Sequence, residues 1–88
     1  MSEIEVTPQG GGAFRVTVDG PQTTTHRVTI PEGMLEELEG ATPEAVVRES
    51  FVFLLEREPN TSILAEFSLD VIERYFPEYR QELLRRLA

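Results

Sequence analysis

The chain has 88 residues, 16 of them acidic and 8 basic, with a formal net charge of −8 at pH 7, so we expect one domain over residues 1–88 with a modest core. It contains no cysteine and all its basic residues are arginine, which excludes disulfides, cysteine-ligated metals and the chemistry of thiolates and lysine amines. The negative charge disfavours nucleic acid and anionic lipid as partners, because both repel a field of the same sign.

The N-terminal third of the chain alternates apolar and polar residues with a period of two, as a β-sheet with one buried face does. The alternating apolar residues are Ile4, Val6, Phe14, Val16, Val18, Val28 and Ile30. We therefore predict three strands, over residues 3–7, 13–19 and 23–30. Segments rich in glycine, proline and polar residues separate these strands, which favours turns and an antiparallel meander.

A helical repeat replaces this alternation from Pro31 onward. Because proline is favoured at the first position of a helix, we predict a helix over residues 31–39. Thr42 is suited to be the N-cap of a second helix, over residues 43–58. Pro59 should end that helix, since the residue before a proline disfavours the helical conformation.

Three shorter helices are predicted after it, over residues 62–67, 68–76 and 77–87. Ser68 is suited to cap the second of these helices, and Pro77 opens the third. The elements together predict the α+β fold class. We expect a three-stranded antiparallel β-meander in the N-terminal half, covered on one face by three to four α-helices from the C-terminal half.

The predicted helix over residues 43–58 is apolar around most of its circumference. Val47 and Phe51 belong to one apolar stripe, whereas Val46 and Phe53 face away from it. A helix of this kind is either central in its fold or shared with a partner. We expect one stripe to pack against the sheet and the other against the C-terminal helices or a second subunit.

Residues 74–79 form the densest aromatic segment of the chain. Aromatic side chains beside arginine are typical of protein interfaces, although the same residues could close the core where two short helices meet. On the interface interpretation, the contact residues are Val46, Phe53, Tyr75 and Tyr79.

Catalytic and metal-binding patterns lack essential parts. His26 is the only histidine, and its strand position places it on the buried face beside Val28, without a second imidazole or a carboxylate pair in the pattern. The serines lack an activating base. We therefore predict no catalytic residue, no metal ligand and no cofactor, and we expect a protein that is not an enzyme.

The stretch from Ser50 to Tyr79 reads SFVFLLEREPNTSILAEFSLDVIERYFPEY. It resembles a group of small bacterial proteins that combine an FLLEREP-like helix end, an SIL turn and an RYFPEY-like close. No activity is established for that group, so the resemblance implies a compact bacterial domain and supplies no mechanism.

A second resemblance is to ribbon-helix-helix regulators, in which a strand with outward polar residues precedes two helices. Thr25, Arg27 and Thr29 match the strand positions that this family uses on base edges, which implies contacts in a major groove. The upstream strands compete for the strand edge that would pair with a second subunit. The negative charge would also weaken every phosphate contact.

These observations predict a small acidic bacterial protein that acts as a non-catalytic protein-interaction module, through a protein partner or through self-association. A ribbon-helix-helix-like or antitoxin-like DNA-binding regulator is the alternative. The N-terminus MSEIEV lacks the basic and apolar parts of a secretory signal, and no apolar run is long enough for a bilayer. We therefore expect a cytoplasmic location and no membrane partner.

Overall fold

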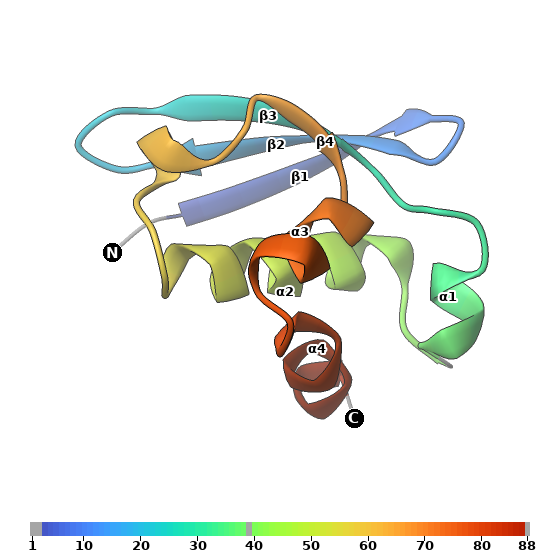
Figure 1. Ribbon diagram of the computed structural model, residues 1–88. Coiled ribbons are helices and arrows are strands. Elements are labelled where there is room, and N and C mark those ends of the chain that lie inside the picture. Colours follow the sequence, from blue (N-terminus) through green and yellow to red (C-terminus); the bar gives the residue numbers. More distant parts are fainter. Residues whose placement is uncertain (1–2, 39, 88) are drawn as a thin grey trace.

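A computed structural model describes residues 3–38 and 40–87 and confirms the α+β fold (Figure 1). The three predicted strands are β1 (Glu3–Gly10), β2 (Ala13–Asp19) and β3 (Thr24–Thr29), and they form the expected antiparallel meander. Their alternating apolar side chains share one face of the sheet, which the helices cover.

A fourth strand, β4 (Glu66–Ser68), extends the sheet in the order β1-β2-β3-β4. It runs parallel to β3 and places Phe67 beside Val28. The predicted helix over residues 62–67 is therefore wrong. The chain instead forms a 3₁₀ turn (Asn60–Ser62) and then the short strand.

The helices are α1 (Met34–Glu37), α2 (Pro43–Leu55), α3 (Asp70–Tyr75) and α4 (Tyr79–Leu87). Each lies inside a predicted helix but is shorter than predicted, and residue 39, the predicted end of the first helix, lies outside the described residues.

Local backbone geometry explains where two of these helices begin. Gly33 has a left-handed backbone with φ of 85°, so α1 begins after it and not at Pro31. The predicted cap of α2 is confirmed, because the Thr42 side chain accepts a hydrogen bond of 3.1 Å from the Ala45 N–H. The predicted cap of α3 is wrong, since Ser68 ends β4 and the helix has no side-chain cap.

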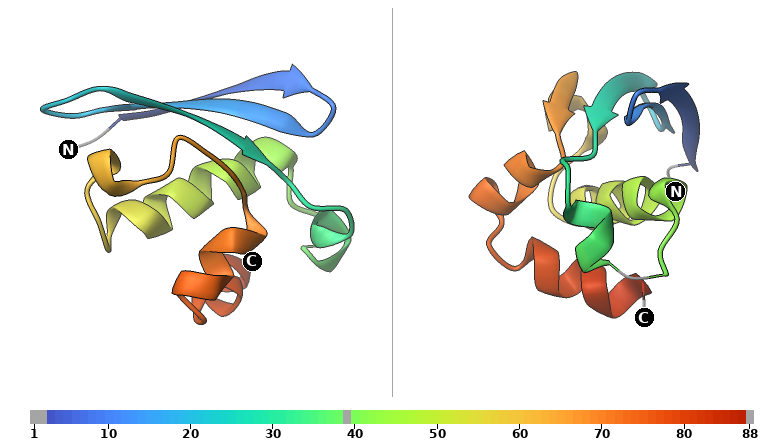
Figure 2. Two further views of the ribbon diagram at one scale, coloured as in Figure 1. Left: turned by 45° about the horizontal axis from the view of Figure 1, so that its top comes forward. Right: turned by 90° about the vertical axis from the view of Figure 1, so that its right-hand side faces the viewer.

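The four helices of the described residues lie on one face of the sheet, and α2 lies between the sheet and α4 (Figures 1 and 2). On the sheet side, the Phe51 ring is 5.4 Å from His26 and 6.0 Å from Phe67, between ring centroids. On the other side, the Phe53 ring is 5.3 Å from Tyr79 and 5.8 Å from Phe76. The second stripe of α2 therefore packs against the C-terminal helices, and no second subunit is needed to cover it.

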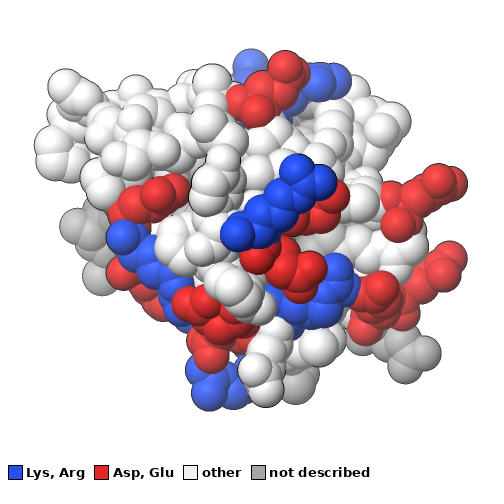
Figure 3. Space-filling model, in the orientation of Figure 1, with Lys and Arg blue, Asp and Glu red and all other residues white. Residues whose placement is uncertain are grey.

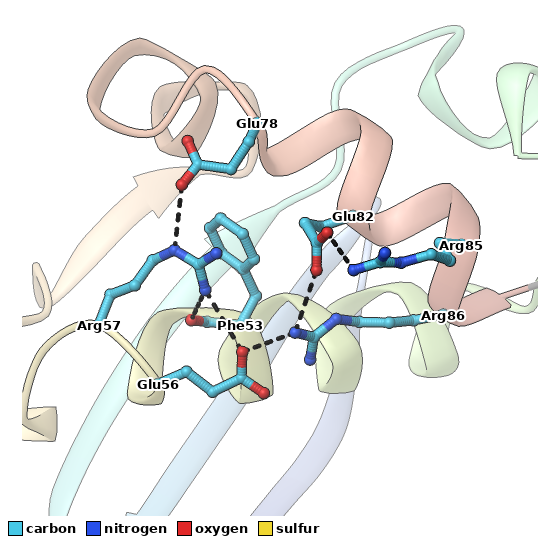
Figure 4. Close-up of polar contacts among 7 residues, drawn as sticks. All are labelled: Phe53, Glu56, Arg57, Glu78, Glu82, Arg85 and Arg86. Atoms are coloured by element: carbon cyan, nitrogen blue, oxygen red, sulfur yellow. Dashed lines mark hydrogen bonds and ion pairs between the residues drawn. The ribbon is translucent and has the colours of Figure 1, made fainter.

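Ionic contacts at the end of α2 hold α4 and the segment before it in place (Figure 4). The Arg57 guanidinium lies 3.6 Å from the centroid of the Phe53 ring and pairs with Glu78 at 3.4 Å. Arg86 of α4 pairs with Glu56 at 2.6 Å, and this hydrogen bond lowers the pKa of the Glu56 carboxyl. The two carboxylates are exposed and the two arginine side chains are partly buried, so these pairs orient the helices and contribute only modestly to the free energy of folding.

Candidate interaction surface

The structure separates the four predicted contact residues. Val46 is 0% exposed, and Phe53 and Tyr79 are each 1% exposed, whereas Tyr75 is 70% exposed. The prediction is therefore wrong for Val46, Phe53 and Tyr79, because these side chains are sealed inside the fold. Of these four residues, only Tyr75 has a side chain that is exposed enough to contact another molecule.

Tyr79 is a core residue whose hydroxyl group is fully paired. Ser50 Oγ donates to the Val46 carbonyl oxygen at 2.6 Å, so the Tyr79 hydroxyl must be the donor in the 2.6 Å bond to Ser50 Oγ. Burial raises the pKa of Tyr79 to about 12, and nearby Glu73 adds to this rise.

An apolar groove of about 290 Å³ opens beside Tyr75. It lies between the end of α2, the segment leading into β4, and α3. Its lining residues are Leu54, Glu58, Ser62, Ile63, Leu64, Phe67, Val71, Ile72, Tyr75 and Phe76. Leu64 is 51% exposed and Tyr75 is 70% exposed, and both line the groove. Exposed large side chains that lie together on an apolar surface are typical of a contact site. We call this feature the Leu64 groove.

Hydrogen bonds of two buried side chains, His26 and Asn60, hold the wall of the Leu64 groove against the sheet. His26 Nδ1 donates to the Leu64 carbonyl oxygen at 2.7 Å, because a carbonyl oxygen can only accept. His26 Nε2 lies 2.8 Å from Thr24 Oγ1, and the same hydroxyl oxygen accepts a hydrogen bond of 2.9 Å from Asn60 Nδ2. Asn60 reaches the Gln22 carbonyl oxygen as well, at 2.8 Å. The single histidine thus lies on the buried face as predicted, and it positions the segment that carries Leu64.

Glu58 is the one charged residue that lines the groove. It is half-buried and forms no ion pair with any residue in 3–38 or 40–87. The adjacent Arg57 is already engaged by Glu56 and Glu78. On the face drawn in Figure 3, acidic and basic groups are closely mixed over the helices, and the upper left part is uncharged. The polar side chains of the groove lining are those of Glu58, Ser62 and Tyr75, and only Glu58 carries a charge.

The two outer edges of the sheet differ. At the β1 edge, Arg48 Nη1 donates to the Ile4 carbonyl oxygen at 2.7 Å, and Pro8 has no N–H to offer. Both features discourage the addition of another strand. At the β4 edge, the Arg27 N–H donates to the Ala65 carbonyl oxygen at 2.7 Å, as a parallel ladder requires.

The register of this ladder determines which main-chain groups of β4 remain open. It directs the N–H and carbonyl of Phe67 toward β3 and those of Glu66 and Ser68 away from the sheet. Within the described part of the chain, no hydrogen bond engages these outward groups. The β4 edge, which adjoins the Leu64 groove through Phe67, can therefore pair with another strand.

The predicted DNA-contacting residues lie on the uncovered face of the sheet. Thr25 and Arg27 are exposed and Thr29 is half-buried. Arg27 pairs with Glu66 at 3.0 Å, and β3 lies between β2 and β4. A ribbon-helix-helix protein pairs this strand with its copy in a second subunit, and here both edges of the strand are already occupied.

No group of three or more histidine, aspartate or glutamate side chains that could hold a metal ion exists among residues 3–38 and 40–87. In the same residues, no helix is long and apolar enough to cross a membrane.

Comparison with known proteins adds no assignment: no protein-family model matches the chain, and no curated protein or solved structure matches it either. The resemblances to the small bacterial group and to ribbon-helix-helix regulators stay predictions.

Proposed function

We propose that this protein is a non-catalytic interaction module of the bacterial cytoplasm, and that the Leu64 groove is its contact surface for a partner protein. The observation that carries the proposal is the exposure of Leu64 and Tyr75 along an apolar groove whose wall is held by a hydrogen bond from the buried His26 side chain. Apolar grooves with a few polar groups and exposed aromatic residues are typical of binding sites.

The proposal no longer depends on the apolar circumference of α2, because that surface is covered within the chain. It depends on surface that the fold leaves open. A partner protein is a better occupant than a second copy of this chain. Two copies would each bring a net charge of −8 and an acidic Glu58 to the contact, and like charges oppose association.

Crosslinking followed by reconstitution tests the proposal. A photoreactive phenylalanine analogue is placed at Tyr75 in the native host, and at Glu36 on α1 as the control position. The partner crosslinked only from Tyr75 is then purified, and its affinity is measured against the unmodified protein, Leu64→Asp and Leu84→Asp. Leu84 is an exposed apolar residue of α4 outside the groove, so its variant controls for the loss of exposed apolar surface.

Leu64→Asp should weaken the complex by about tenfold or more, because it places a charge in a desolvated contact, and Leu84→Asp should leave it unchanged. Equal weakening by both variants would contradict the assignment of the groove. Sedimentation velocity of the purified protein tests whether a second copy of the chain occupies the groove instead. A dimer that Leu64→Asp dissociates would show that the groove binds a second copy and not a partner protein.

A further inference from the structure

We propose that the Leu64 groove selects an extended partner segment in which an arginine or lysine lies two positions from a large apolar residue, so that both side chains are on the same face of the strand. The apolar side chain enters the groove and the cation pairs with Glu58. The inference rests on the proposed function and adds to it the chemistry of the partner.

The charge of the partner follows from Glu58. The Glu58 carboxylate is half-buried in a mostly apolar lining, so it offers a ligand cation an opposite charge that the rest of the lining does not. No residue of the described chain supplies a positive charge there, because Arg57 is held by Glu56 and Glu78 and the groove lining contains no arginine. The net charge of −8 favours a basic partner at longer range as well.

The extended conformation follows from the β4 edge. The outward main-chain groups of Glu66 and Ser68 can pair with a strand of the partner. That strand would lie beside β4, on the edge away from β3, and next to the part of the groove that Phe67 lines. Side chains of a strand alternate between its two faces. Every second residue of an added strand would therefore point toward the helical layer, where Val71 and Tyr75 line the groove.

A peptide series tests the charge preference directly. The probes are short synthetic peptides of serine and threonine with one central phenylalanine or leucine, and the position two residues from it, on the same face of an extended chain, is arginine, glutamine or glutamate. Binding is measured by fluorescence anisotropy for the unmodified protein, Glu58→Gln, Glu58→Arg and Glu36→Gln. Glu36 is an exposed glutamate of α1, so Glu36→Gln removes the same charge far from the groove.

The arginine peptide should bind about five- to tenfold more tightly than the glutamine peptide, and the glutamate peptide should bind least. Glu58→Gln should abolish the preference for arginine, Glu58→Arg should transfer it to the glutamate peptide, and Glu36→Gln should leave it intact. Added salt should weaken the binding of the arginine peptide more than the binding of the glutamine peptide, because salt screens the ion pair with Glu58.

The test separates failure of the inference from failure of the proposed function. If all peptides bind equally and Leu64→Asp abolishes their binding, the groove is a contact surface and the pairing with Glu58 is wrong. If Glu58→Gln and Glu36→Gln change the preference equally, the effect is that of net charge and the inference is also overturned. If no peptide binds, the inference fails, and the crosslinking from Tyr75 decides the proposed function alone.

Discussion

Tyr79 should make the stability of this protein fall steeply in alkali. Its pKa is raised from 10.0 to about 12 in the folded chain, mainly by burial. Below the unfolded value of 10.0 the phenol is neutral in both states, so its full contribution to stability is present. As pH rises toward 12, only the unfolded state loses the proton, and the free energy of unfolding falls by up to about 2.7 kcal/mol.

The composition makes this effect measurable. The chain has no lysine, no cysteine and only two tyrosines, so few groups titrate between pH 9 and 12. Urea unfolding should be followed by circular dichroism across this range for Tyr75→Phe, whose tyrosinate absorbance then reports on Tyr79 alone. Tyr79→Phe should lose most of the alkaline dependence. If Tyr79 titrates near 10.0 while the chain remains folded, the reasoning is refuted.

Three further outcomes follow from the packing and the charge. Phe53→Ala should lower the free energy of unfolding by about 3–5 kcal/mol, measured by urea denaturation; a loss below about 1 kcal/mol would contradict its place between α2 and the C-terminal helices. Asn60→Ala should cost about 1–3 kcal/mol and speed amide hydrogen exchange in residues 60–64, and unchanged exchange there would show that the side chain does not hold this segment. The protein should not retard duplex DNA even at low salt; binding that Arg27→Ala weakens would instead support the DNA-binding alternative.

Local patterns were sufficient for most of the architecture. The alternation through Phe14, Val16 and Val18 depends only on neighbouring residues and on one buried face, so the meander could be predicted. The beginning of α2 could be predicted for a similar reason, because Thr42 and Pro43 define a helix start without help from the rest of the fold.

The strand β4 could not be predicted, because three residues are too few to show a period. Its conformation is set by pairing with β3 and by the bond from His26 to the Leu64 carbonyl oxygen, both across large distances in sequence. The groove depends on the same segment. The predicted contact residues therefore did not include Leu64, Phe67 and Val71. The one sequence feature that pointed to the groove was the position of Leu64 shortly after the turn-forming residues 60–62.

The apolar circumference of α2 led to an incorrect choice for a different reason. A helix covered by a sheet on one side and by α4 on the other has the same pattern as a helix shared between subunits. The sequence alone cannot separate these cases, since the pattern reports burial and not the identity of the covering chain. The packing of Phe53 against Phe76 and Tyr79 decides between them.

The asymmetry of the sheet edges strengthens the case for the groove. The longer edge strand, β1, is protected by Arg48 at the Ile4 carbonyl oxygen and by Pro8, as expected for a chain that must avoid uncontrolled strand pairing. The shorter edge, β4, keeps its outward main-chain groups open and lies beside the apolar groove. If the open edge were only a consequence of a short strand, nothing would require exposed apolar side chains next to it, or a carboxylate that forms no ion pair within residues 3–38 and 40–87. The proposed addition of a basic, apolar strand would account for all three features together.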